Sequence, residues 1–78
     1  MICAEQVRAA RALLGWSQAT LAAKAGLSVP TIKRMESGAL ERSTMANVDA
    51  VRRALEAAGC SFLTDDGNGP GVRAKSAA

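Results

Sequence analysis

The sequence contains no histidine and only two cysteines, Cys3 and Cys60, which lie far apart in the chain. The usual structural zinc sites need four cysteine or histidine ligands, so one chain cannot supply such a site. A small secreted scaffold would normally carry more cysteines, so we expect both thiols to be reduced and Cys60 to be packed among apolar neighbours. No metal and no cofactor is therefore expected.

Groups that could carry out catalysis are equally sparse. Without histidine or a glycine-rich phosphate loop, a serine or cysteine nucleophile has no base beside it to activate it. Asp65 and Asp66 are adjacent in a run of turn residues, and neighbouring side chains of an extended stretch point to opposite sides. They make a poor acid–base pair and are interpreted as part of a solvated turn. We expect that the protein is not an enzyme.

Aromatic residues are scarce, and long apolar runs are absent. Aromatic side chains favour strands and make up 3% of the chain, whereas many of its apolar residues are alanine, the strongest helix former. No segment approaches the ~20 apolar residues of a membrane-spanning helix. Residues 1–6 lack the basic stretch and the apolar run that begin a signal peptide. These absences favour a mainly helical, cytoplasmic protein with no membrane contact.

The chain has 78 residues, a formal net charge of +3 and a sequence pI near 9.4. A chain of this length forms one small domain with a modest core. The positive charge suits an anionic partner such as nucleic acid, but many proteins carry as much on an ordinary solvated surface. Charge alone therefore does not decide between these two interpretations.

Apolar residues at helical spacing predict four helices, with a glycine or polar residues at their ends. The predicted helices cover residues 4–14, 18–25, 29–36 and 45–58, and residues 39–43 are expected to form a loop. Residues expected to face the core from the first and last helices are Val7, Ala10, Leu13, Leu14, Val48, Val51 and Leu55. Side-chain oxygens that can cap helix N-termini belong to Ser17, Ser28, and Ser43 or Thr44.

The C-terminal tail has a different pattern. Residues 60–64 form a short, apolar, partly alternating run, residues 65–71 are rich in turn formers, and residues 72–75 could form a returning strand. An isolated two-stranded hairpin is marginal in water, so we expect this one to pack on the helices or on a second subunit.

The most informative segment is residues 17–38, where two short helices are joined by a tight turn. Ala22 is small enough for the helices to cross closely, and Gly26 lets the chain reverse without steric cost. Ile32 and Met35 lie three residues apart and would fix the second helix against the body of the protein. The N-terminal end of that helix would then project outward, where it can enter a DNA major groove.

The stretch LLGWSQATLAAKAGLSVPTIKRMESG resembles the lambda-repressor-like, or Cro-like, helix-turn-helix family, also called the XRE family, and the resemblance covers roughly residues 4–58. The matching residues are Ser17-Gln18, Leu21-Ala22, Ala25-Gly26-Leu27-Ser28, Thr31-Ile32 and Met35-Glu36-Ser37-Gly38. The resemblance implies a mainly α fold of four to five helices. We expect a DNA-binding domain over residues 1–59 and a short C-terminal strand or hairpin within residues 60–78.

The resemblance also implies which residues contact DNA. These are Ser17, Gln18, Ser28, Val29, Thr31, Lys33 and Arg34. Gln18 opens the first helix of the motif, where members of the family commonly contact a phosphate. Ser17 and Ser28 are expected to cap helices first and to contact phosphates second.

Base recognition is expected from the second helix of the motif. Lys33 and Arg34 can donate hydrogen bonds to guanine, and the methyl groups of Thr31 or Val29 can contact that of thymine. Val29 and Pro30 stand where the family often has longer polar side chains. Discrimination between sequences is therefore expected from Thr31, Lys33 and Arg34, or in part from DNA shape.

Other prominent residues have a simpler interpretation. Trp16 is expected to plug the core or the hinge, because base-stacking sites usually use several aromatic side chains. Arg52 and Arg53 are interpreted as solvent-exposed helix residues. Glu36 and Glu41 are interpreted as diluting the positive charge of the surface.

The predicted function is that of a sequence-specific regulator that binds double-stranded DNA as a homodimer, most simply as a repressor. The helix at 29–36 would enter the major groove, and the tail at 60–78, with or without the fourth helix, would hold the dimer together. The alternative is a protein-interaction module. An antitoxin would bind DNA and also a protein partner docked on the tail, whereas a pure adapter would bind no DNA.

Overall fold

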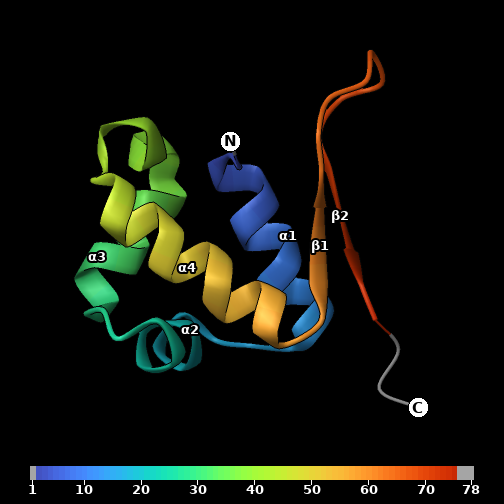
Figure 1. Cartoon of the computed structure of the whole chain (residues 1–78). Helices are drawn as coiled ribbons and strands as arrows, with labels where there is room; N and C mark the ends of the chain where they lie inside the picture. The colour runs from blue at the N-terminus through green and yellow to red at the C-terminus, as the bar shows by residue number, and fades with distance from the viewer. Residues whose placement is uncertain (1, 76–78) are drawn as a thin grey trace.

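Four α-helices and one β-hairpin make up residues 2–75 in the computed structural model, which describes these residues except for the side chains at positions 39 and 41 (Figure 1). The helices are α1 (Ala4–Leu14), α2 (Gln18–Ala25), α3 (Val29–Arg34) and α4 (Met45–Ala57). Two short helical turns, η1 (Met35–Ala39) and η2 (Leu40–Arg42), connect α3 to α4, and the hairpin consists of β1 (Cys60–Leu63) and β2 (Gly71–Ala74). The prediction of a mainly helical fold with a C-terminal hairpin is confirmed.

The core lies where the helices meet. The largest fully buried side chains are Leu21, Ile32, Met35, Leu55, Val7 and Val51. The predicted inward face of α4 is confirmed, but Leu13 was wrongly assigned to the core because 55% of its surface is exposed. The buried stripe of α1 runs through Val7 and Ala10, with Leu14 packed at its edge, and the helical rotation carries Leu13 away from that stripe.

The connection between α3 and α4 is more ordered than the predicted loop at 39–43. Gly38 has a φ of 103°, which turns the chain at the end of the motif. The short turn η2 follows because Leu40, only 2% exposed, must reach the core. Of the two candidate caps for α4, Thr44 fills the role, since its Oγ1 accepts a hydrogen bond from the Asn47 N–H at 3.2 Å.

The hairpin is antiparallel and lies along one side of the helices (Figure 1). Cys60 is opposite Ala74, and Leu63 is opposite Gly71. β2 contacts α1, and β1 contacts α4. Phe62 packs against the core from β1, so the prediction that the hairpin needs support is met by the helices of its own chain. The end of the predicted tail, residues 76–78, lies outside the described residues.

A single glutamine joins α1 to the hairpin. The side chain of Gln6 is buried, and its Nε2 donates to the carbonyl oxygens of Gly71 at 2.8 Å and Leu63 at 3.2 Å. Its Oε1 accepts a hydrogen bond from the Cys3 N–H at 2.9 Å. Because both ends of the amide are satisfied, this polar group can lie in the interior and fix the hairpin against the helix.

Both thiols are free, and Cys60 belongs to the core, as predicted. Burial raises the pKa of the Cys60 thiol, which keeps the thiol protonated and unreactive. Among residues 2–75, no helix has the length and apolar character needed to cross a membrane.

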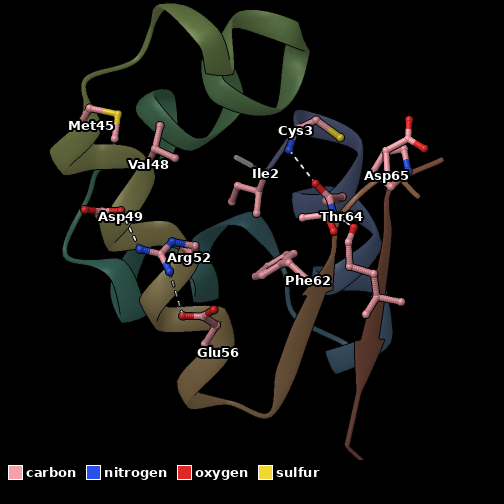
Figure 2. A pocket seen from close by; sticks show the side chains of 13 residues that line it. Ile2, Cys3, Met45, Val48, Asp49, Arg52, Glu56, Phe62, Thr64 and Asp65 are labelled. Carbon is pink, nitrogen blue, oxygen red and sulfur yellow. Dashed lines mark hydrogen bonds and ion pairs between the residues drawn. The ribbon is translucent and has the colours of Figure 1, made fainter. Parts of the chain in front are cut away.

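A groove of about 760 Å³ is lined on one side by α4 and on the other by β1 (Figure 2). Val48 and Asp49 line it from α4, Phe62 and Leu63 line it from β1, and Ile2 lies between the two walls. On the α4 side, Arg52 forms ion pairs with Asp49 at 2.9 Å and with Glu56 at 3.5 Å. The prediction that Arg52 is exposed is therefore only partly met, because its side chain is 40% exposed and lies against two carboxylates.

Candidate nucleic-acid interface

The α2 and α3 helices are joined by a turn over residues 26–28. Gly26 ends α2 with φ 70° and ψ 31°, a left-handed conformation that costs other residues free energy. The Leu27 N–H then donates to the Ala22 carbonyl at 2.9 Å, which closes the helix end. No atom lies within 4 Å of the place where a Cβ would stand at Gly26. Backbone conformation, rather than lack of space, is therefore why glycine fits this corner.

The two serines predicted as caps occupy those positions. The Ser17 Oγ accepts a hydrogen bond from the Thr20 N–H at 3.0 Å, and the Ser28 Oγ accepts one from the Thr31 N–H at 3.3 Å. Each serine hydroxyl also lies within 3.0 Å of the hydroxyl of its threonine. Ser17 and Ser28 are exposed, so they can cap their helices while still facing solvent.

One face of α3, the second helix of the motif, packs against the core, and the opposite face is exposed to solvent. Ile32 and Met35 are each 1% exposed and anchor it in the core. Lys33 and Arg34 are exposed, whereas Thr31 is half-buried. The anchoring expected from the spacing of the apolar residues is confirmed, and it leaves both basic side chains in solvent.

The remaining candidates differ in their surroundings. Val29 is half-buried and packs against the edge of the core, so only part of its side chain is available for contact. Gln18 is also half-buried, and its Nε2 donates to the carboxylate of Glu36 at 3.0 Å. The seven predicted residues therefore lie on adjoining elements, but Gln18 and Val29 are partly engaged with the protein itself.

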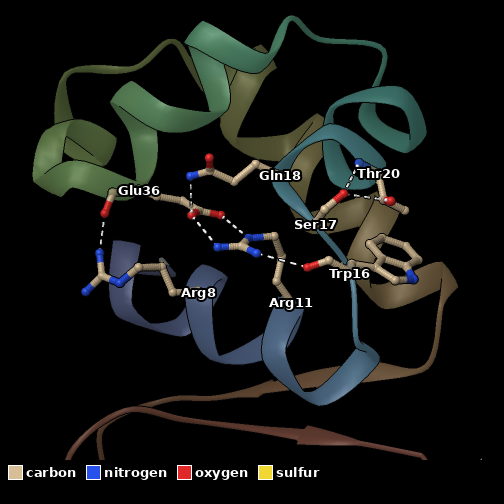
Figure 3. Close-up of polar contacts among 7 residues, drawn as sticks. All are labelled: Arg8, Arg11, Trp16, Ser17, Gln18, Thr20 and Glu36. Atoms are coloured by element: carbon tan, nitrogen blue, oxygen red, sulfur yellow. Dashed lines mark hydrogen bonds and ion pairs between the residues drawn. The ribbon is translucent and has the colours of Figure 1, made fainter.

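A buried carboxylate organises the polar contacts beside the motif (Figure 3). Glu36 is 4% exposed, and Arg11 of α1 donates to its two oxygens at 2.6 and 2.8 Å. Arg11 also donates to the carbonyl oxygen of Trp16 at 2.9 Å, and Arg8 donates to the carbonyl oxygen of Glu36. Three parts of the chain are thus joined: α1, the segment before α2, and η1 after α3.

The charge state of this cluster follows from its contacts. Burial by itself would raise the pKa of Glu36, but hydrogen bonds from Arg11 and Gln18 and the positive charges of Arg11 and Arg8 lower this pKa below its ordinary value. The hydrogen bond with Glu36 raises the pKa of Arg11. Both partners are therefore charged at neutral pH.

The interpretation of Glu36 as a diluting surface charge was wrong. Its carboxylate is buried and neutralised by Arg11, so it removes little positive potential from the exposed face. The side chain of Glu41, the second residue given that role, lies outside the described part of the structure. Among the side chains that the structure describes, neither Lys33 nor Arg34 forms an ion pair with a carboxylate, so their charges face solvent.

Two further expectations concern side chains near the motif and in the tail. Trp16 is half-buried against the core, which confirms its role as a plug. Asp65 and Asp66 lie in an exposed turn, where the Asp65 carboxylate accepts hydrogen bonds from the N–H groups of Gly67 and Gly69 at 2.9 and 2.8 Å. These backbone hydrogen bonds lower the pKa of Asp65, and the interpretation of a solvated turn is confirmed.

The closely joined helix pair, with its left-handed corner and its exposed basic face, defines a DNA-binding protein of the helix-turn-helix class. A family model described as "Helix-turn-helix" matches residues 7–63, more than half of the chain, and the chain belongs to this lambda-repressor-like, XRE-type family. No curated protein matches the chain. The protein is thus a DNA-binding transcription regulator, from a family that is not typically enzymatic.

Proposed function

We propose that the protein is a sequence-specific repressor that binds double-stranded DNA as a homodimer and inserts residues 29–36 into the major groove. The observation that carries this proposal is the two-sided environment of α3. Ile32 is buried against the body, while Lys33 and Arg34 are exposed and have no carboxylate partner among the described side chains. A helix held in this way can present basic side chains to base edges without unfolding any part of the core.

The residues proposed to contact DNA divide into two groups. Ser17, Gln18 and Ser28 would contact phosphates and set the position of the motif on the duplex. Val29, Thr31, Lys33 and Arg34 would face the base edges. Because Val29 offers only an apolar surface, most hydrogen-bonded discrimination would come from Lys33 and Arg34.

A dimer is proposed because one recognition helix contacts too few base pairs for useful selectivity. Related modules bind two half-sites ~34 Å apart on one face of the DNA. A regulator that occupies such a site blocks access to the promoter by its presence alone, which is why we propose repression. The protein would act on DNA in the cytoplasm.

Selection of bound sequences from random double-stranded DNA tests the proposal. We expect a palindromic consensus with two half-sites about one helical turn apart, and an affinity that falls steeply as salt is raised. An asymmetric consensus, or no enrichment at all, would contradict the proposal. No enrichment together with a stably co-purifying protein would instead favour an adapter, and enrichment with such a partner would favour an antitoxin.

Variants then test the assignment of the recognition face. Combining Lys33→Ala with Arg34→Ala should weaken binding to the selected sequence by ~1–3 kcal/mol per lost base contact. The matched control combines Arg53→Ala with Lys75→Ala, which also removes two exposed positive charges but lies outside the motif. If both double variants lose affinity equally, bulk charge rather than the recognition face accounts for binding.

A further inference from the structure

The turn between β1 and β2 contains the pair Asn68-Gly69. Every residue from 64 to 70 is exposed, and Figure 1 shows this turn projecting beyond the ends of the helices. Asparagine is among the residue types that are chemically unstable in proteins. When glycine follows it in an exposed turn, its side-chain amide can react with the next main-chain nitrogen. The contacts around this pair therefore decide how fast the reaction proceeds.

The reaction is an intramolecular deamidation. The main-chain nitrogen of Gly69 loses its proton to solvent and attacks Cγ of Asn68, which forms an N–Cγ bond and closes a succinimide ring. The Cγ–Nδ2 bond breaks, and the side-chain nitrogen takes a proton from solvent and leaves as ammonia. Water then opens the ring at either of its carbonyl carbons, which gives aspartate or an isoaspartyl linkage. Water is the only co-reactant, and nothing is oxidised or reduced.

The two reacting groups are accessible to each other. No atom lies within 4 Å of the place where a Cβ would stand at Gly69, so no neighbour shields its nitrogen on that side. The main-chain N–H of Asn68 donates to Oδ1 of Asp66 at 3.1 Å. Its side-chain amide has no hydrogen-bond partner among the described residues. The amide can therefore turn toward the Gly69 nitrogen without losing a contact.

One carboxylate holds the attacking nitrogen in its protonated form. Oδ1 of Asp65 accepts hydrogen bonds from the Gly69 N–H at 2.8 Å and from the Gly67 N–H at 2.9 Å. A hydrogen bond to the protonated nitrogen and a negative charge beside it both disfavour loss of the proton. These hydrogen bonds also lower the pKa of Asp65, so its carboxylate is ionised at neutral pH and is a poor base for removing that proton.

Asn47 is the second asparagine of the chain and has a different environment. It lies in the first turn of α4, where its N–H donates to Oγ1 of Thr44. The following residue, Val48, is 3% exposed, and its N–H donates to the carbonyl oxygen of Thr44 at 3.0 Å. Attack on Asn47 would require a buried, branched residue to give up a helical hydrogen bond. Asn47 is therefore an internal control that should stay unmodified in the folded chain.

We infer that Asn68 is a site of spontaneous deamidation through a succinimide, and that Asp65 slows the reaction by holding the Gly69 N–H. The product places a further negative charge in the turn and takes the formal net charge of +3 one unit lower. The isoaspartyl form also lengthens the main chain by one carbon. Gln6 fixes the strand ends below the turn, so the change is confined to the exposed tip. The inference does not depend on DNA binding.

Peptide mass spectrometry of the incubated chain tests the site. The whole chain is kept at mildly alkaline pH, with and without denaturing urea, because unfolding removes the hydrogen bond from the Gly69 N–H to Asp65. In both samples we expect the peptide that contains Asn68 to gain the mass difference between water and ammonia, several-fold faster in urea. No gain in either sample would remove the site. Equal rates in the two samples would show that the fold does not protect Asn68 and would overturn the role of Asp65.

Variants in the folded chain test the protection. Asp65→Ala should raise the deamidation rate several-fold, close to the rate in urea. The matched control Asp66→Ala removes the same charge from the neighbouring position, but it leaves the hydrogen bond from the Gly69 N–H in place and should react like the wild type. Equal acceleration in both variants would assign the protection to the order of the turn in general and would overturn the role of Asp65.

Two further measurements complete the test. Adding Asn68→Gln to Asp65→Ala should abolish the mass gain, because the longer side chain forms the cyclic imide far less readily, and a persistent gain would place the reaction elsewhere. Hydrogen exchange in β1 and β2 of Asp65→Ala should match that of the wild type. Faster exchange throughout the hairpin would assign the protection to the hairpin as a whole rather than to the single hydrogen bond.

Discussion

Arg11 and Glu36 form a bidentate ion pair, with hydrogen bonds of 2.6 and 2.8 Å, between α1 and the turn η1 that follows α3. The Glu36 side chain is 3% exposed and the Arg11 side chain is 20% exposed. A planar guanidinium that meets both oxygens restrains orientation as well as distance. This pair therefore fixes how the helix-turn-helix sits on α1.

We expect Arg11→Met to destabilise the fold strongly, because it leaves the buried Glu36 carboxylate without its main partner. The expected loss in free energy of unfolding is about 3 kcal/mol, near the lower end for broken buried pairs since Arg11 is partly exposed. Urea denaturation followed by circular dichroism measures it. The double variant Arg11→Met with Glu36→Met should be less destabilised than the sum of the single variants, whereas strict additivity would show that the two residues are not coupled.

The same carboxylate predicts a pH dependence. Its pKa is lower in the folded chain than its ordinary value of 4.5, so ionised Glu36 stabilises the fold above about that pH. The stabilisation is lost as the pH falls through the lower folded value. We expect the free energy of unfolding to be flat from neutral pH to about 5 and to decline below that. In the variant Glu36→Gln, the free energy of unfolding should decline less steeply as the pH falls. An equally steep decline would mean that other carboxyl groups cause the pH dependence.

Local sequence patterns predicted the four helices, although α3 ends at Arg34 rather than at residue 36, and they identified the caps of α2 and α3. Ser17 and Ser28 could be recognised as caps because the N–H groups they accept lie only three residues further along the chain. The buried positions Ile32 and Met35 followed from helical spacing in the same way. The helix-turn-helix and its exposed face could thus be predicted from neighbouring residues alone.

Contacts between distant segments could not be predicted in this way. Glu36 looks like a surface charge until Arg11, 25 residues earlier, is brought beside it by the packing of α1. Gln6 looks like an ordinary polar helix residue, although its amide bonds to the hairpin 65 residues later. Helical spacing gives the face on which a side chain lies, but it carries no information about which segment covers that face.

We expect Gln6→Leu to loosen the hairpin without affecting the helix-turn-helix. The substitution removes the hydrogen bonds to the carbonyl oxygens of Leu63 and Gly71. We expect it to lower the free energy of opening the hairpin by about 1–3 kcal/mol. Hydrogen exchange should accelerate in residues 60–75 more than in α2 and α3. Ala12→Ser on the exposed face of the same helix serves as the control. Uniform acceleration over the whole chain would mean that the hairpin and helices open as one unit.

The corner at Gly26 gives a prediction about backbone conformation. The φ angle of Gly26 is 70°, and no atom crowds the position where a Cβ would stand. Gly26→Ala should therefore lower the free energy of unfolding by about 1–2 kcal/mol, because alanine disfavours the left-handed conformation. Gly26→Asn should cost less, since asparagine adopts this conformation more readily. Thermal unfolding compares the two variants. Equal losses would show that a different property of glycine governs this position.

Gln18 could contact a DNA phosphate or support the helix-turn-helix from inside the protein, and a variant can distinguish these two roles. Its Nε2 is hydrogen-bonded to Glu36 at 3.0 Å, so replacing it changes both the protein interior and any phosphate contact. If Gln18 contacts a phosphate, Gln18→Ala should weaken binding by a similar factor on selected and unrelated DNA, whereas Lys33→Ala should weaken mainly the selected sequence. Fluorescence anisotropy on both DNAs measures the two factors. Loss of selectivity with Gln18→Ala would instead mean that its bond to Glu36 orients α3, because a phosphate contact alone carries no sequence information.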